Sequence, residues 1–123
     1  MTDKIVKTFQ IIDIPVSKAW AMINAFGKRE GCFLGLTEKE YLSLDIDQYA
    51  IAYRATFKSG MSFLQDFQGI IQLVEIDPNR TRIEWTTFFK VSYAKAFQAE
   101  LAINRLFRDS MQCFQQFDLQ QAA

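Results

Sequence analysis

The side chains that could carry out catalysis are few, because the sequence contains no histidine. This excludes Ser-His-Asp and Cys-His nucleophile systems, and it removes the one side chain that titrates near neutrality without help. The two cysteines, Cys32 and Cys113, are far apart and match no metal-binding or redox spacing. We therefore expect two buried, reduced thiols, no metal and no cofactor. A disulfide between the two cysteines is an open alternative, but nothing in the sequence supports it.

Acid–base chemistry would need a carboxylate inside the protein, and Asp66 and Glu84 are the candidates. Both lie, like Arg54, on the face of a predicted strand opposite its apolar residues. Ion pairing across strands on the solvent side therefore explains all three. The alternative is a strand bulge that turns Asp66 or Glu84 inward, where it would act as a general acid or base beside a proton donor such as Tyr53.

The composition indicates one soluble domain over residues 1–123. Half of the residues are apolar and 23% are charged, and the fourteen basic residues cancel the fourteen acidic ones. Zero net charge gives no overall basis for binding nucleic acid or an anionic membrane. No apolar run approaches the roughly 18 residues of a membrane helix, and no signal peptide is visible, so we expect a cytoplasmic protein. Twelve phenylalanines, four tyrosines and two tryptophans exceed what so small a core needs.

The first part of the chain carries a strand signal, then a helix signal. Residues 4 to 14 are rich in β-branched and aromatic residues, which predicts a strand. Apolar residues at steps of three and four predict a helix over residues 16 to 26, with Ser17 as its N-cap and Gly27 just past its end. A second strand is expected over about residues 32 to 41.

Three further strands follow, joined by hairpin turns. The turns are expected at residues 45–48, 58–60 and 77–80, and the strands at 49–57, 62–76 and 82–91. On the middle strand, alternation places Phe63, Gln65 and Phe67 on the inner face and Asp66 on the outer face. Gly69 marks a bend or a bulge, as glycine in strands often does.

A long helix is expected at the end of the chain. From about residue 93 to residue 118 there is no glycine or proline, and an apolar stripe persists for about seven turns. A strand, a short helix, an antiparallel meander and a long terminal helix predict an α+β domain with the helices on one face of the sheet. A strongly curved sheet would wrap around the long helix.

Two segments give the chain a family resemblance. The segment IPVSKAWAMINAFG is similar to the first helix of the SRPBCC superfamily, also called START-like or Bet v 1-like, and RTRIEWTTFF is similar to the strand before its terminal helix. The resemblance covers nearly the whole chain. It implies the helix-grip fold, in which a curved antiparallel sheet wraps around a long C-terminal α-helix and encloses an apolar cavity. Neither segment is a catalytic signature.

The chain departs from this family in two ways. It is shorter than most members by some twenty residues, and the deficit falls between Gly27 and Tyr49, which predicts a smaller or more open cavity. Phenylalanines are also dense along the terminal helix, at Phe97, Phe107, Phe114 and Phe117. These rings either line the cavity or fill it, and the sequence leaves both possibilities open.

The candidate site lies between the sheet and the terminal helix. The predicted ligand-binding residues are Tyr53, Phe63, Gln65, Phe67, Trp85, Thr87 and Phe89 from the sheet and Phe107, Met111 and Phe114 from the helix. Ile71, Leu106 and Ser110 complete the predicted lining. A few polar groups in an apolar cleft are what orienting a ligand requires, and Tyr53, Gln65 and Thr87 are predicted to supply them.

Three functions fit this pattern. The first is binding of a small hydrophobic or aromatic ligand, such as a lipid or a polyketide-like molecule. The second is a polyketide cyclase-like or dehydratase-like enzyme that uses Tyr53 and an inward carboxylate. The third is an interaction module with a filled core. Its outer sheet face, with Leu64, Ile70 and Phe88, would contact a partner or a second copy of the chain, so a homodimer is an open alternative.

Overall fold

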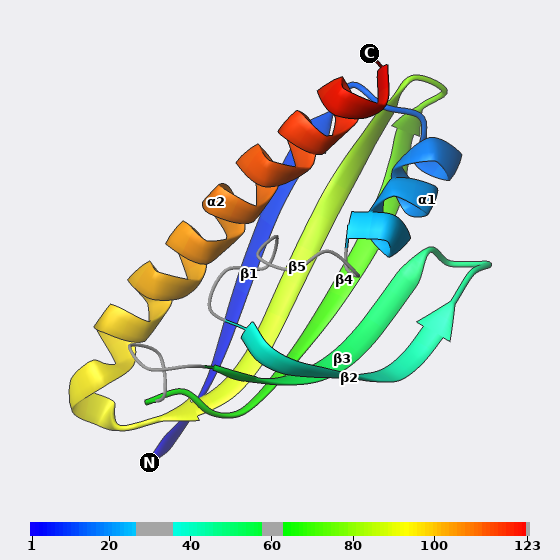
Figure 1. The fold of residues 1–123 in the computed structure, drawn as a ribbon. Helices are drawn as coiled ribbons and strands as arrows, with labels where there is room; N and C mark the ends of the chain where they lie inside the picture. Colours follow the sequence, from blue (N-terminus) through cyan, green and yellow to red (C-terminus); the bar gives the residue numbers. More distant parts are fainter. Residues whose placement is uncertain (27–35, 58–62, 123) are drawn as a thin grey trace.

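The structure is a computed structural model that describes residues 1–26, 36–57 and 63–122. Its strands are β1 (Thr2–Ile12), β2 (Leu36–Asp45), β3 (Ala50–Phe57), β4 (Gln65–Asp77) and β5 (Arg80–Val91). Its helices are α1 (Val16–Phe26), the short 3-10 helix η1 (Tyr93–Lys95) and α2 (Ala96–Ala122) (Figure 1). The predictions for Gly27, Cys32 and the turn at 58–60 lie outside the described residues, as do the side chains of Cys113 and Phe117.

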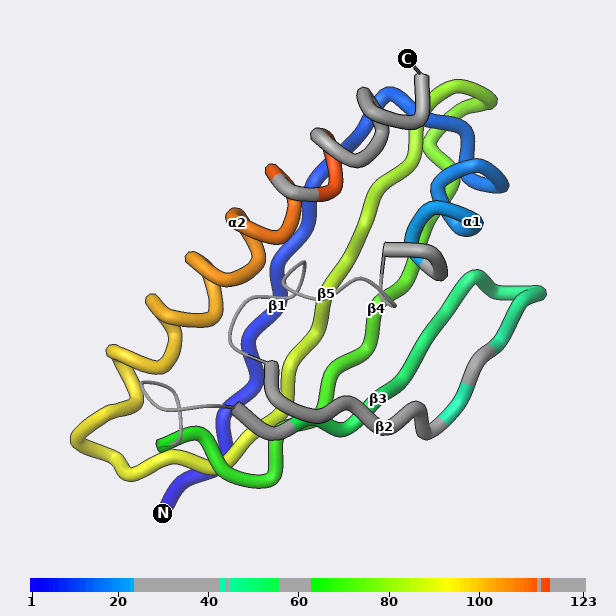
Figure 2. Tube along the Cα trace, in the orientation of Figure 1, coloured from blue at the N-terminus to red at the C-terminus, as the bar shows by residue number. Residues whose placement is uncertain are grey.

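The five strands form one antiparallel sheet in the order β1-β5-β4-β3-β2. Figure 1 shows this sheet curving, and α2 runs along it beside β1 and β5, which it contacts. The Cα trace in Figure 2 shows the same diagonal course for α2 and β1, while α1 lies over β4. The predicted α+β helix-grip arrangement, a curved antiparallel sheet with a long C-terminal helix, is therefore confirmed.

Helix α1 has the bounds that its apolar spacing predicts, but a different residue caps it. The backbone N–H of Ala19 donates to the carbonyl of Pro15 at 2.9 Å, so Pro15 accepts the first hydrogen bond of the helix. Proline suits this place because its missing N–H would have no partner there. Ser17 lies inside the first turn, and the prediction that it is the N-cap is wrong.

Strand β4 contains a bulge that the alternation of the sequence does not show. The pairing of β4 with β5 shifts register between Gln65 and Gln68, and Asp66 has a φ of 51°, in the left-handed region. Before the bulge the alternation is reversed, so Leu64 is buried while Gln65 is exposed. The predictions that Gln65 points inward and that Leu64 lies on the outer face are therefore wrong.

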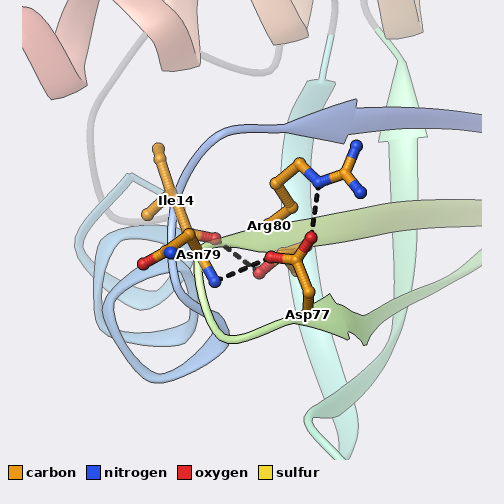
Figure 3. Close-up of polar contacts among 5 residues, drawn as sticks. Ile14, Asp77, Asn79 and Arg80 are labelled. Atoms are coloured by element: carbon orange, nitrogen blue, oxygen red, sulfur yellow. Dashed lines mark hydrogen bonds and ion pairs between the residues drawn. The ribbon is translucent and has the colours of Figure 1, made fainter.

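The β2–β3 and β4–β5 hairpins turn where predicted, and an aspartate side chain shapes each turn. The Asp45 carboxylate accepts the backbone N–H groups of Asp47 at 3.1 Å and Gln48 at 3.2 Å, which shapes the β2–β3 turn. In the β4–β5 turn, Asp77 accepts the N–H of Asn79 at 2.9 Å and Nε of Arg80 at 2.7 Å (Figure 3). The hydrogen bond from Arg80 is the main reason that the pKa of Asp77 lies below its usual value.

The inner faces of the long elements meet in a single core. On β5 the buried residues include the predicted Trp85, Thr87 and Phe89, and also Ile83 and Val91. On α2 the buried residues are Ala99, Ile103, Leu106, Phe107, Ser110, Met111 and Phe114. The strand period of two and the helix period of 3.6 therefore bring these two sets face to face. Within the described ranges, no helix is both long enough and apolar enough to cross a membrane.

Candidate functional site

An aromatic cluster lies between the sheet and α2. It consists of Tyr53, Phe67, Trp85, Phe89 and Phe107. The ring centroids of Phe67 lie 6.4 Å from Tyr53, 6.3 Å from Trp85 and 6.3 Å from Phe89. Trp85 stacks on Phe107 of α2 with centroids 5.9 Å apart and an interplanar angle of 20°. These separations are within the range of favourable aromatic pairs, so the cluster holds α2 against the sheet.

One hydrogen bond lies inside the aromatic cluster. Nε1 of Trp85 donates to the hydroxyl oxygen of Tyr53 at 2.7 Å, and both residues are almost fully buried. A buried indole N–H without an acceptor would be costly, so Tyr53 allows a tryptophan to lie at this depth. The bond also orients the two rings relative to one another.

The place of Tyr53 depends on a glycine in the next strand. Tyr53 of β3 pairs with Gly69 of β4, and its ring lies directly over the glycine backbone. A Cβ atom at Gly69 would come within 2.5 Å of both Cζ and the hydroxyl oxygen of Tyr53. The pairing of β4 is regular through Gly69, so no bulge lies there; a bulge lies at Asp66, and Gly69 gives room for the ring.

A small apolar cavity adjoins the aromatic cluster. Its volume is about 10 Å³, and its lining consists of Ile23, Ile71, Ile83, Trp85, Phe107, Ser110 and Met111. A space of this size is about that of one water molecule, but a buried water needs two to four polar partners. The hydroxyl of Ser110 is the polar side-chain group of this lining that is not already engaged. Oγ of Ser110 has no hydrogen-bond partner among the described residues.

The arrangement of these elements is shared with solved structures. A protein from Bacillus thuringiensis of unknown function matches with a TM-score of 0.76 at 13% identity, over 92% of this chain and 97% of that one. Norcoclaurine synthase from Thalictrum flavum matches with a TM-score of 0.73 at 8% identity, over 97% and 88%. The Zhui aromatase/cyclase from a Streptomyces species matches with a TM-score of 0.68 at 14% identity, over 92% of each chain. The chain has the Bet v 1-like helix-grip fold.

The likeness is one of structure, because no protein-family model and no curated protein matches the sequence. At 8 to 14% identity it establishes the Bet v 1-like fold. The function must therefore be inferred from the side chains in the interior of this chain.

Most of the predicted ligand-binding residues meet inside the Bet v 1-like fold. Tyr53, Phe67, Trp85, Phe89 and Phe107 form the aromatic cluster, and Met111 lines the cavity beside it. Thr87 and Phe114 are fully buried, and Oγ1 of Thr87 donates to the carbonyl of Val6 at 3.1 Å. Because the Thr87 hydroxyl proton is engaged in this bond, it is not available to a ligand, and a role for Thr87 in orienting a ligand stays a prediction.

Two predicted residues lie elsewhere, and two lining residues were missed. Gln65 is exposed before the bulge. Phe63 is half-buried against the core, and Nζ of Lys95 lies 5.4 Å from its ring centroid. Ile23 of α1 and Ile83 of β5 line the cavity, although neither was among the predicted lining residues. For Ile23 the available signal was its place in the apolar stripe of residues 16 to 26, but that stripe does not say which part of the sheet it faces.

The acid–base pair predicted for a cyclase-like enzyme does not form in the described part of the chain. Asp66 is at the bulge, yet its side chain is 74% exposed and pairs with Lys90 at 3.8 Å. Glu84 lies on the outer face of β5, 2.9 Å from Nε of Arg82. The bulge therefore turns neither carboxylate towards Tyr53. The predicted outer-face position of Asp66 and Glu84 is confirmed, but only Asp66 pairs across strands, because the partner of Glu84 lies on the same strand.

The outer face of the sheet carries exposed apolar residues. Ile70 is 37% exposed, as predicted for the interaction module, and Phe88 is half-buried, while Leu64 is in the core. Ile5 and Phe9 of β1 are 58% and 66% exposed on the same outer face. A homodimer through this face stays a prediction, which sedimentation at several concentrations tests.

Proposed function

We propose that this protein binds a small, uncharged hydrophobic or aromatic molecule between its sheet and α2. The observation that carries the proposal is the apolar cavity beside the aromatic cluster, where the Ser110 hydroxyl, without a partner among the described residues, lies among apolar side chains. Ligand pockets typically have this character, a mainly apolar lining with few polar groups. The fold is consistent with such a role, since the norcoclaurine synthase structure holds dopamine and hydroxybenzaldehyde.

The cavity must widen before it can hold an aromatic ring, because about 10 Å³ accommodates no more than one water molecule. Met111 is the lining residue best suited to give way. Its unbranched side chain has three rotatable bonds and adapts to irregular space. We expect the ligand to displace Met111 and to contact Trp85, which lines the same cavity. A lipid or a polyketide-like molecule is the class of ligand that we propose.

Naphthalene should change the fluorescence of Trp85 and stabilise the protein. Trp20 is replaced by phenylalanine so that Trp85 is the only tryptophan that contributes to the emission. We expect the Trp85 emission to change as naphthalene is added and to stop changing at about one naphthalene per chain. The melting temperature should rise with naphthalene concentration, because a ligand that binds only the folded state stabilises it.

A control variant separates the interior from the outer face. Phe9 is 66% exposed on β1 and does not belong to the cavity lining, so Phe9→Ser should leave the titration unchanged. Loss of the signal in Phe9→Ser would place the probe on the outer sheet face and contradict the proposal. So would the absence of any change in emission and melting temperature in the Trp20→Phe protein.

A further inference from the structure

Ser110 is a buried hydroxyl without a partner among the described residues. It is 2% exposed on the buried stripe of α2, and it lines the cavity together with Trp85, Phe107 and Met111. An unpaired hydroxyl in an apolar interior costs free energy, and alanine at the same place would avoid that cost with a better helix propensity. The serine at this position is therefore unfavourable for the unliganded fold.

The buried threonine hydroxyls are satisfied, which sets Ser110 apart from them. Oγ1 of Thr81 donates to the carbonyl of Ile14 at 2.7 Å, and Oγ1 of Thr87 donates to the carbonyl of Val6 at 3.1 Å. The polar side-chain atom of Trp85, its Nε1, is already bound to Tyr53. Ser110 is therefore the group of the cavity lining that can still form a hydrogen bond with an incoming molecule.

We propose that Ser110 anchors the single polar group of the ligand and thereby selects its chemical class. This inference rests on the proposed function. The lining holds the Ser110 hydroxyl, six apolar or aromatic side chains and no charged group. A ligand with one hydroxyl or carbonyl group satisfies Oγ of Ser110, since serine both donates and accepts. A carboxylate or an ammonium group would lose its hydration without finding an opposite charge, so the site selects neutral phenols and ketones over acids and amines.

The test compares 2-naphthol with naphthalene, which differ by one hydroxyl group. Their dissociation constants are measured by calorimetry for the wild-type protein and for Ser110→Ala, and the preference is the ratio of the two constants. We expect the preference for 2-naphthol to fall about tenfold in Ser110→Ala, as for the loss of one hydrogen bond. The affinity for naphthalene should stay the same. Asn104→Ala, an exposed change on the same helix, should leave the preference unaltered.

Each outcome decides between the anchor and the proposed function. An equal preference in wild type and Ser110→Ala, with both ligands bound, overturns the anchor alone. An equal fall of the preference in Asn104→Ala also overturns the anchor, because the effect would then come from a change in the whole helix and not from Ser110. Failure of the wild type to bind either ligand overturns the proposed function and the anchor with it. Without ligand, Ser110→Ala should melt at a higher temperature, and a lower one would show that the hydroxyl is already partnered.

Discussion

Replacing Trp85 with alanine should lower the free energy of unfolding by about 3 to 5 kcal/mol, the usual cost of removing a large buried aromatic side chain. Trp85 is 3% exposed and stacks on Phe107, so its loss removes an aromatic contact between β5 and α2. It also removes the hydrogen bond to Tyr53. Total stabilities of small domains are about 5 to 15 kcal/mol, so this one change takes a large share. Denaturant unfolding followed by circular dichroism measures it.

Thr86→Ala is the matched control for this change. Thr86 is the next residue of the same strand and is half-buried on the opposite face, away from the aromatic cluster. Its replacement should cost less than about 1 kcal/mol, in the range of ordinary surface changes. If Trp85→Ala costs no more than Thr86→Ala, the indole is not packed as described. The assignment of Trp85 to the inner face would then be wrong as well.

The elements that the sequence predicts best are those with long, uninterrupted periodicity. Alternation on β5 places Trp85 and Thr87 on the inner face, and the stripe on α2 places Phe107 on the buried side of the helix. These positions follow from local geometry alone, because a strand repeats every two residues and a helix every 3.6. Sequence periodicity is therefore sufficient to predict that Trp85 and Phe107 both lie on buried faces, but their contact depends on how the helix is placed along the sheet.

The errors occur where the backbone departs from regular geometry. The bulge at Asp66 reverses the alternation before it, which exposes Gln65 and buries Leu64. Aspartate tolerates the left-handed region, but it does so in many contexts and is not a specific signal of a bulge. The neighbouring Gly69 is a stronger signal of irregularity, and it drew the prediction to the wrong place. Its actual role depends on the β3–β4 register, which local sequence does not determine.

Replacing Gly69 with alanine should destabilise the protein by about 3 kcal/mol, although alanine is normally the better residue in a strand. The new Cβ would lie 2.5 Å from the Tyr53 ring, which must move. That ring is 1% exposed and accepts a hydrogen bond from Trp85, so any movement disturbs the packed core around it. Overpacking costs about 1 to 3 kcal/mol, and an indole N–H left without an acceptor adds about 1 to 3 kcal/mol.

The double mutant with Tyr53→Leu tests whether the ring is the cause. Leucine does not extend over Gly69 as the tyrosine ring does, so Gly69→Ala in the Tyr53→Leu background should be neutral or stabilising by up to about 1 kcal/mol. The sign of the effect of Gly69→Ala would then differ between the two backgrounds, and equilibrium unfolding of the four proteins gives the coupling energy. Equal destabilisation in both backgrounds would mean that backbone strain, and not the Tyr53 ring, requires glycine. A stabilising Gly69→Ala in the wild-type background would show that the ring does not lie over Gly69.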